Sequence, residues 1–335
     1  MRGKVDTKRR SWLRSTLLLP LLWMVAGCQR SLASAPPAAE GANQVRVSNY
    51  PDLASAVAAL PSGGGTVYID QTIQLHSTVD VPPGVEIAGC CALPGNNGTS
   101  NHDTNHLQQT HIMVAQGVSP AFRLHGASGV KGVFLHKAGV DFGDNSAAMF
   151  ADDAIHIRGE DAYVDGCFIT GFNQAVHALK AQRPRISNNR IDCLNGIWVE
   201  TAYDIARIRD NHCWPFVTAA VDTPASAWRE GTAFGFAEVC DWGQLQGNFC
   251  FGYRYGFVFH NVAQMTVTQC GADSFPVDRR GIGFLITGAC ENITLIACQA
   301  ASQSIGFQNN MPPVDRPNRM IGCSHWANDT HVSGW

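Results

Sequence analysis

Side chains that could carry acid–base, charge-pairing and stacking chemistry recur at short intervals in the middle of this chain. They are Arg123, Asp152, Asp153, His156, Arg158, His177, Trp198 and Glu200. Histidine moves protons near neutral pH, arginine pairs bidentately with carboxylates, and an indole ring offers a sugar an apolar face. The set therefore favours chemistry on an acidic, uronate-containing polysaccharide.

Two reactions fit these residue types. In a lyase, Arg123 or Arg158 would neutralise the uronate carboxylate, which acidifies the neighbouring C–H, and one of the two histidines would remove that proton. In a hydrolase, two carboxylates must flank the glycosidic oxygen, and the candidates are Asp152, Asp153 and Glu200. We favour the lyase over the hydrolase because histidine and arginine outnumber well-paired carboxylates, and epimerisation stays open.

A short repeated unit must position these residues. Its motif, a small residue followed by apolar, outward and apolar positions, begins at Ala121, Ala154, Ala175, Gly196, Ala233, Gly256, Gly281 and Ser304. Alternation with period two predicts a strand with one buried face in every copy. The copies start 21 to 25 residues apart, apart from two intervals of 33 and 37. Such an array, with no helical period between copies, predicts a solenoid of parallel strands.

A second strand follows in most units, as in residues 163–169. Alignment of these strands gives one column of Cys167, Asn189, Asn211, Asn248, Cys270, Cys298 and Cys323. We expect the asparagines to pass side-chain hydrogen bonds from coil to coil and the cysteines to fill the same slot as small hydrophobes. Cys213 and Cys250 share an aligned position in adjacent units, which permits a disulfide without implying one.

The outward positions of the first strands form a shared face. We expect Arg123, Asp153, His156, Arg158, His177, Trp198 and Glu200 on it, over four consecutive coils. Later units carry Gly235, Val258, Gly283 and Gly306 at the middle position. The two long intervals add residues near 138–153 and 214–232, which predicts two loop walls roughly 14 Å apart beside this face. The alternative is that turns simply tolerate insertions.

The N-terminus reads as a targeting segment. A basic stretch precedes the apolar run 15–27, which is too short to span a bilayer and suits a signal peptide. The run ends at Val25-Ala26-Gly27-Cys28, which resembles the lipobox of bacterial lipoproteins. The resemblance implies cleavage before Cys28, its acylation, attachment to the membrane and, with Gln29 next, outer-membrane sorting in the cell envelope. Whether the anchored protein faces the periplasm or the surface stays open.

These boundaries predict three parts. Residues 1–27 form a lipoprotein signal peptide, residues 28–44 the lipidated cysteine with a flexible tether, and residues 45–335 a single repeat domain.

The start of that domain carries a family resemblance. An Ala-rich helical segment at 53–60, Gly63-Gly64-Gly65 and the strand 81–89 together resemble the entry of the pectin-lyase-like right-handed parallel β-helix superfamily. The resemblance covers nearly all of residues 45–330. It implies an all-β, single-stranded right-handed parallel β-helix (solenoid) whose short N-terminal helix caps the open end of the core. This fold hosts lyases, hydrolases, epimerases and non-enzymatic proteins, so it does not define the reaction.

Residues 152–157, Asp-Asp-Ala-Ile-His-Ile, resemble the paired-Asp motif of polygalacturonases. The resemblance implies that Asp153 is the general acid and that Asp152 helps to activate water. The match is partial, because Ser119-Pro120 and Asn173-Gln174-Ala175 replace the family's motifs in the neighbouring coils.

Composition excludes other classes of protein. The chain has 24 Lys and Arg against 27 Asp and Glu, without the basic excess of a nucleic-acid-binding domain. Its 12 cysteines include no C-x-x-C pair. We expect no required cofactor or metal: no cage of carboxylates for Ca²⁺ is visible, and only a loop with His102, Asp103, His106 and His111 has metal-binding residue types.

We therefore expect a lipid-anchored enzyme that acts on an acidic glycan. The alternative is a non-catalytic β-helix lipoprotein that binds glycan or handles exopolysaccharide, and a third reading is a purely structural surface repeat. The sequence leaves the oligomeric state open.

Overall fold

The computed structural model describes residues 41, 43–89, 111–140, 150–218 and 228–335. The predicted signal peptide, Cys28, and the loop with His102, Asp103 and His106 lie outside these residues. Within the described segments, no helix has the length and apolar character needed to cross a membrane.

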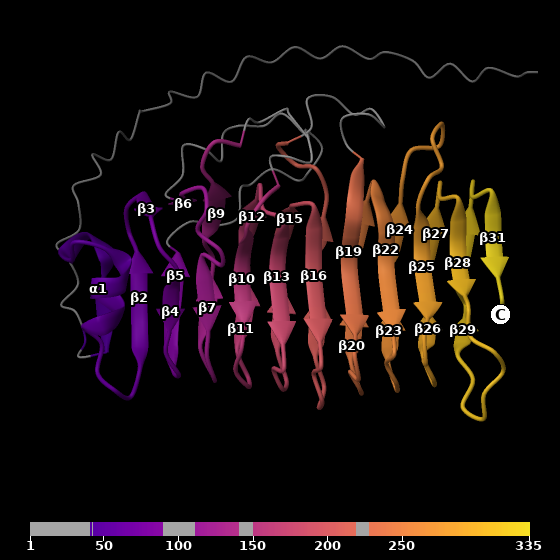
Figure 1. The fold of residues 1–335 in the computed structure, drawn as a ribbon, viewed down its shortest axis with the longest axis horizontal. Coiled ribbons are helices and arrows are strands. Elements are labelled where there is room, and N and C mark those ends of the chain that lie inside the picture. Colours follow the sequence, from indigo (N-terminus) through magenta and orange to yellow (C-terminus); the bar gives the residue numbers. More distant parts are fainter. Residues whose placement is uncertain (1–40, 42, 90–110, 141–149, 219–227) are drawn as a thin grey trace, which may run out of the picture. The chain divides into compact units, whose positions relative to one another are not determined.

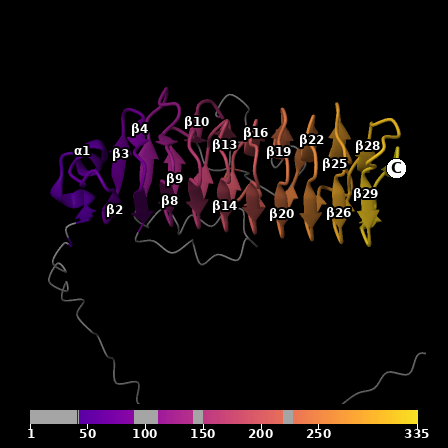
Figure 2. The same cartoon turned by 90° about the horizontal axis from the view of Figure 1, so that it is seen from below.

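The described chain is an all-β right-handed parallel β-helix, as predicted (Figure 1). Its strands form three parallel sheets, and each complete coil adds one strand to each sheet. The view from below shows the successive coils side by side along the helix axis (Figure 2).

One of the three sheets, which we call the first sheet, has 11 strands. They are β1 (Gln44–Arg46), β2 (Gly65–Ile69), β5 (Val85–Gly89), β8 (Gly129–Lys131), β11 (Tyr163–Asp165), β14 (Arg185–Ser187), β17 (Arg207–Arg209), β20 (Gln244–Gln246), β23 (Thr266–Thr268), β26 (Thr294–Ile296) and β29 (Arg319–Ile321).

The second sheet has 10 strands and carries the predicted chemistry. They are β4 (Val79–Val81), β7 (Phe122–Leu124), β10 (Asp153–Ile157), β13 (Gln174–Leu179), β16 (Asn195–Glu200), β19 (Arg229–Ala237), β22 (Tyr253–His260), β25 (Ile282–Thr287), β28 (Ile305–Asn309) and β31 (Thr330–Ser333).

The third sheet also has 10 strands. They are β3 (Ile73–Leu75), β6 (Ile112–Val114), β9 (Phe134–Lys137), β12 (Phe168–Thr170), β15 (Arg190–Asp192), β18 (His212–Cys213), β21 (Phe249–Phe251), β24 (Gly271–Asp273), β27 (Gln299–Ala301) and β30 (Ser324–Trp326).

The first coil is closed by a short helix, as the resemblance implied. Helix α1 (Leu53–Ala58) follows a 3-10 turn, η1 (Val47–Asn49), and begins where the Asp52 side chain accepts a hydrogen bond from the Ser55 amide (2.7 Å). Leu53, Ala56 and Val57 are buried. The helix lies at the end of the stack of coils (Figure 1).

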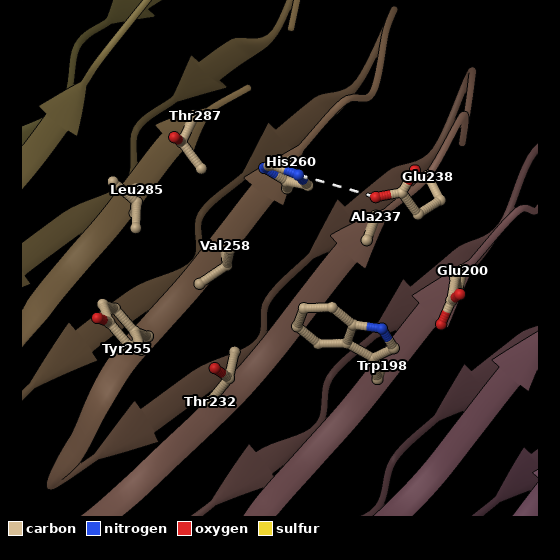
Figure 3. A pocket seen from close by; sticks show the side chains of 10 residues that line it. All are labelled: Trp198, Glu200, Thr232, Ala237, Glu238, Tyr255, Val258, His260, Leu285 and Thr287. Carbon is tan, nitrogen blue, oxygen red and sulfur yellow. Dashed lines mark ion pairs between the residues drawn. The ribbon is translucent and has the colours of Figure 1, made fainter. Parts of the chain in front are cut away.

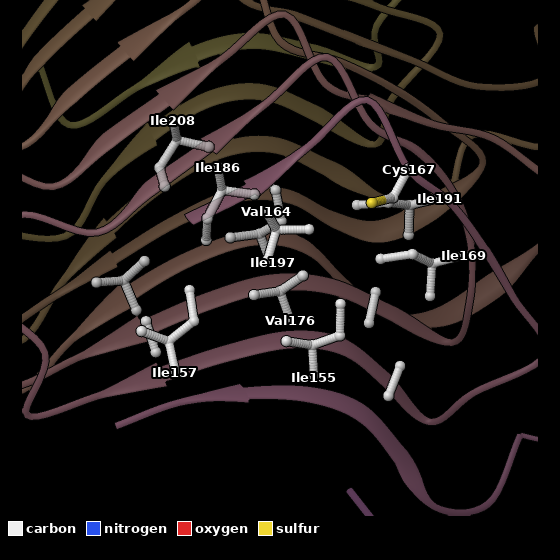
Figure 4. Close-up of a cluster of buried hydrophobic side chains, with 14 of the residues drawn as sticks. Ile155, Ile157, Val164, Cys167, Ile169, Val176, Ile186, Ile191, Ile197 and Ile208 are labelled. Atoms are coloured by element: carbon white, nitrogen blue, oxygen red, sulfur yellow. The ribbon is translucent and has the colours of Figure 1, made fainter. Parts of the chain in front are cut away.

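Inward side chains from all three sheets fill one continuous core (Figure 4). Ile155 and Ile157 of β10, Val164 of β11 and Ile169 of β12 are completely buried. Like residues stack on like in successive coils, because the strands pair in register. Further along, the rings of Phe234, Phe257, Phe284 and Phe307 stack with centroids 4.6 to 4.9 Å apart.

The predicted second strand at 163–169 is in fact two strands, β11 and β12. Gly166, with φ 62°, breaks them, and Asn188 (φ 58°), Asp210 (φ 54°) and Gly247 (φ 64°) break the equivalent segments. Residues of these types adopt positive φ more readily than others do. One left-handed residue per coil therefore turns the chain from the first sheet into the third, and we had read the two strands as one.

The predicted polar column is confirmed at this turn. Asn189 Nδ2 donates to Asn211 Oδ1 (2.8 Å), Asn211 Nδ2 donates to Asn248 Oδ1 (3.0 Å), and both asparagines are buried. Each amide oxygen also accepts from the backbone amide one coil back, as when Asn189 N donates to Asn211 Oδ1 (3.1 Å). The nine described cysteines are free thiols, and Cys213 and Cys250 are register neighbours without a disulfide.

The predicted register of the last units is wrong by two residues. Phe257 pairs with Phe284 and Phe284 with Phe307, so the outward residues beyond Val258 are Leu285 and Gln308 rather than Gly283 and Gly306. A small residue followed by alternating apolar residues occurs at Gly281 and at Ser304. This alignment predicts a strand as well as the observed alignment does, so the sequence pattern could not distinguish the two. The extra residues lie in the turn before β25, which lengthens that coil.

Replacement of Asn211 by alanine tests the asparagine ladder. The change leaves one N–H of the buried Asn189 side chain and the Asn189 backbone amide without an acceptor, so we expect a loss of about 3 kcal/mol in the free energy of unfolding. Chemical denaturation followed by circular dichroism measures it. The control Gln246→Ala, at an exposed position of the next coil, should stay within about 0.5 kcal/mol of wild type. Equal effects of the two changes would contradict the ladder's role.

Candidate functional site

The outer face of the second sheet brings the predicted polar residues together. Arg123, His156, His177 and Trp198 are register neighbours on β7, β10, β13 and β16. Because parallel coils are about 4.8 Å apart, these four side chains form a continuous row along the helix axis. The row runs from a charged end at Arg123 to an aromatic end at Trp198.

His156 has both ring nitrogens engaged. Its Nε2 lies 2.9 Å from Asp153 Oδ2, and its Nδ1 lies 3.0 Å from Arg158 Nη2. An arginine only donates, so Nδ1 accepts and the proton is on Nε2, which donates to Asp153. This histidine is therefore a neutral link between an acid and a base, with no nitrogen left for a substrate.

His177 is arranged differently. Its Nε2 lies 3.3 Å from Glu200 Oε2, and among the described residues no hydrogen-bond partner faces Nδ1. A proton on Nε2 directed at Glu200 leaves the lone pair of Nδ1 free. The rings of His156 and His177 meet edge to face with centroids 5.5 Å apart. His177 is thus the histidine of this pair that can accept a proton from a bound molecule.

Burial and a neighbouring cation keep His177 neutral. Partial burial lowers its pKa from the usual 6.5, and the charge of Arg158 lowers it further, against the opposing effect of Glu200. A histidine with a lowered pKa is in its basic form at neutral pH.

Asp153 is held as a carboxylate. Burial alone would raise its pKa, but hydrogen bonds from His156 and from Asn173 Nδ2 (3.1 Å to Oδ1) bring the pKa below the usual value. The Asp153 amide also donates to Ser119 Oγ (2.9 Å). The lowered pKa favours the ionised carboxylate, whereas the role that the polygalacturonase resemblance implied for Asp153, a general acid, needs the protonated form.

Arg158 lies half-buried beside both histidines. Its Nη1 donates to the carbonyl oxygens of Ile157 (3.0 Å) and His177 (3.1 Å). Burial and the charge of Arg123 lower the pKa of this guanidinium, which stays cationic because arginine starts from so high a value. Arg123, one coil before His156, forms a 2.9 Å ion pair with Asp80, a partner that we had not predicted.

Asp152 does not join this face. Its φ is 63°, its Oδ2 lies 2.9 Å from the buried Lys137 Nζ, and the Gly117 amide donates to the same oxygen (2.8 Å). These partners belong to the corner between the third and second sheets. Asp152 and Asp153 therefore have separate environments and do not act as a pair.

Asp153 and Glu200 are not arranged as a hydrolytic pair either. Asp153 is in register with Gln174 and then Asn195, and Glu200 lies five residues beyond Asn195 on β16. Two coils and five strand residues separate the two Cα atoms by about 19 Å. Each carboxylate is directed at a histidine, Asp153 at His156 (2.9 Å) and Glu200 at His177 (3.3 Å). The imidazoles of His156 and His177 occupy the space between these two carboxylates.

A hollow opens on the other side of Trp198 (Figure 3). We call it the hollow; it has a volume of about 460 Å³ and is lined by Trp198, Glu200, Thr232, Ala237, Glu238, Tyr255, Val258, His260, Leu285 and Thr287. The indole of Trp198 lies over Gly235, where a Cβ would be 1.9 Å from the indole Cε3. Glycine at this outward position therefore makes the space that the indole occupies.

Sequence reasoning missed most of the hollow. Gly235 and Val258 were placed at outward positions, but their small or apolar character was taken as the absence of a site. The signal that could have found it was a glycine directly after an outward tryptophan in the same column. Leu285 was missed because of the register error.

The middle of each predicted wall, residues 141–149 and 219–227, lies outside the described residues. At the beginning of the second extension, Phe216 and Val217 pack on Phe134 and Phe168, on the outer face of the third sheet. His111 lies beside Phe134, with ring centroids 5.3 Å apart. Within the described ranges, no group of three or more His, Cys, Asp or Glu side chains could hold a metal ion.

The charges around His177 can be tested by titration. Arg158→Met removes a nearby cation and should raise the pKa of His177, whereas Glu200→Gln removes the stabilising carboxylate and should lower it. NMR of the histidine ring protons across pH measures both. Arg279→Met, an exposed arginine paired with Asp329, is the matched control and should leave the titration unchanged. Shifts of the same sign in the Arg158 and Glu200 variants would contradict this assignment.

Known proteins resemble the chain in structure. No protein-family model and no curated protein matches the sequence. A DFA-IIIase from Arthrobacter chlorophenolicus A6 in complex with GF2 aligns with a TM-score of 0.56 at 13% identity, over 84% of this chain and 80% of that one. The DFA-IIIase without its lid aligns with a TM-score of 0.55 at 13% identity, over 85% and 81%. At such identities the likeness establishes a shared parallel β-helix fold.

Proposed function

We propose that this protein is a polysaccharide-active enzyme that acts on a uronate-containing glycan, and that its reaction begins when His177 removes a proton from the uronate. The observation that carries the proposal is the His177–Glu200 pair: a half-buried imidazole, held by a carboxylate on one nitrogen and free on the other, next to a guanidinium.

Each neighbouring group has a role in this reaction. Arg158, with Arg123 one coil away, supplies positive charge for the uronate carboxylate, which acidifies the adjacent C5–H. His177 Nδ1 takes that proton while Glu200 orients the ring and stabilises the imidazolium. The C5–H electron pair forms the C4–C5 double bond, the C4–O bond breaks, and the leaving oxygen takes a proton from solvent. The products are an unsaturated uronate and a new sugar end.

Elimination fits the site better than hydrolysis does. Asp152 is bound to Lys137, Asp153 is held ionised by His156 and Asn173, and Glu200 is directed at His177. A hydrolase needs two carboxylates that flank one glycosidic bond, whereas here the two histidines lie between Asp153 and Glu200. The DFA-IIIase that shares the fold shows that an enzyme can be built on this scaffold, and the choice of a uronate substrate rests on the arginines and His177.

Replacement of His177 by alanine tests the base. With uronate-containing polysaccharides, we expect kcat to fall by about 10³-fold and affinity to change little, as general-base loss predicts. The ultraviolet absorbance of unsaturated uronate and the release of reducing ends, followed together, report the reaction. In wild type, kcat/KM should fall as the pH drops through the lowered pKa of His177, below 6.5, because protonation removes the base.

Other outcomes separate the competing functions. Reducing ends without unsaturated product would indicate hydrolysis, and a changed sugar configuration without cleavage would indicate epimerisation. Binding without any turnover would favour the non-catalytic glycan-binding function. In that case affinity is the one property of these assays that His177→Ala could change. Trp198→Ala should weaken binding under both the enzymatic and the binding function, because both use the indole face.

We also propose that the protein is a lipoprotein of the bacterial outer membrane, anchored through Cys28. The support is the sequence Val25-Ala26-Gly27-Cys28 behind a basic and apolar leader, with Gln29 following. Metabolic labelling with radioactive palmitate, followed by membrane fractionation, should label the wild type and the Cys323→Ser control but not Cys28→Ser. An unlabelled wild type would contradict acylation, and label in the inner membrane would contradict the sorting.

A further inference from the structure

The hollow and the catalytic end of the face differ in charge. Arg123 and Arg158 lie around His156 and His177, whereas none of the described residues that line the hollow is a lysine or arginine. Two carboxylates, Glu200 and Glu238, border the hollow (Figure 3). Glu200 is directed to His177, and Glu238 lies 3.7 Å from His260 with half of its side chain exposed. A second uronate in the hollow would therefore meet negative charge with no fixed cation to offset it.

The floor of the hollow is apolar. Val258 is 8% exposed, Leu285 is half-buried and outward, and Trp198 presents its indole beside them. Val258 and Leu285 are register neighbours, and Gly235 precedes Val258 in the same column. Outward apolar side chains that neighbour an indole suit the less polar face of a sugar or the methyl group of an acyl substituent. Thr232 and Thr287 at the edges offer hydroxyl groups for hydrogen bonds.

The hollow is close enough to the base for both to hold one chain. Trp198, which lines the hollow, is the register neighbour of His177, about 4.8 Å away along the axis. Glu200 contributes to both places, because it pairs with His177 and borders the hollow. Adjoining residues of one polysaccharide can therefore occupy the catalytic end and the hollow at the same time.

We propose that the hollow binds an uncharged sugar whose substituent ends in a methyl group, such as an acetamido group, so that the substrate is a heteropolysaccharide in which this sugar adjoins the uronate. The inference rests on the proposed function for the identity of the residue at His177. The hollow itself selects against a homopolymer of uronates.

Equilibrium binding tests this selection. The probes are a hyaluronan tetrasaccharide, which alternates uronate with N-acetylglucosamine, and a galacturonate tetrasaccharide of the same length. The full-length His177→Ala protein is titrated with each by calorimetry, so that turnover does not interfere. We expect the alternating oligosaccharide to bind at least about tenfold more tightly. Equal affinities, tighter binding of the galacturonate or no binding of either would overturn the proposal.

A charge placed in the hollow should change the preference. Leu285→Lys in the same background should raise the affinity for the galacturonate probe about fivefold, the size of a surface ion pair, and weaken the alternating probe. Ile321→Lys adds the same charge at an exposed position of the first sheet and should change neither affinity. If Leu285→Lys does not fold, Glu238→Gln, which removes one border carboxylate, should raise galacturonate affinity in the same direction. No response in any folded hollow variant would also overturn the proposal.

The test separates this inference from the proposed function. If the alternating probe binds preferentially but wild type does not cleave it, the proposed selectivity of the hollow is supported and the proposed lyase activity is contradicted. If wild type cleaves uronate-containing substrates but both probes bind with equal affinity, the proposed lyase activity is supported and the proposed selectivity of the hollow is contradicted.

Discussion

In-register stacking of buried side chains is the constraint on which the rest of this structure depends. Phe122, Ile155, Val176, Ile197 and Phe234 lie above one another at the same inward position of five coils. The outward residue that follows each of them is then fixed in direction by strand alternation and in spacing by the coil repeat. A slip of one residue in any coil would bury a charged or polar side chain such as His177. The apolar core therefore positions the functional face.

The asparagine ladder complements this packing at the corner between the first and third sheets. The side-chain amide of each asparagine there forms a hydrogen bond with a backbone group and another with a residue of the next coil. A column of apolar side chains could form neither bond. Where cysteine replaces asparagine, as at Cys270, the same turn is kept with a smaller side chain. The corner thus holds its geometry along the stack with two residue types.

Much of the fold could be predicted from the sequence because like residues recur at like positions. The alternating pairs predicted the second sheet, the Asn and Cys column predicted a stack of buried side chains, and the columns together placed Arg123, His156, His177 and Trp198 side by side. The periodic pattern could not predict the places where a single dihedral angle sets the direction of the chain or of a side chain. Positive φ at Gly166 divides a strand, and positive φ at Asp152 turns its carboxylate toward Lys137. The different hydrogen bonding of His156 and His177 was equally hidden, because it depends on the long reach of Arg158. The last coils were misregistered because Ile282-Gly283-Phe284 alternates as convincingly as the true frame.

The position of the hollow one coil from His177 bears on how such a protein can diverge. Since each coil is a nearly self-contained segment that pairs only with its two neighbours, duplication or loss of a whole coil between Trp198 and Leu285 would preserve every inward column. It would lengthen or shorten the binding surface by about 4.8 Å, close to the size of one sugar residue, and leave His177 and Glu200 unchanged. Specificity for chain length and for the neighbouring sugar can therefore evolve through gain or loss of coils, while His177 and Glu200 stay unchanged.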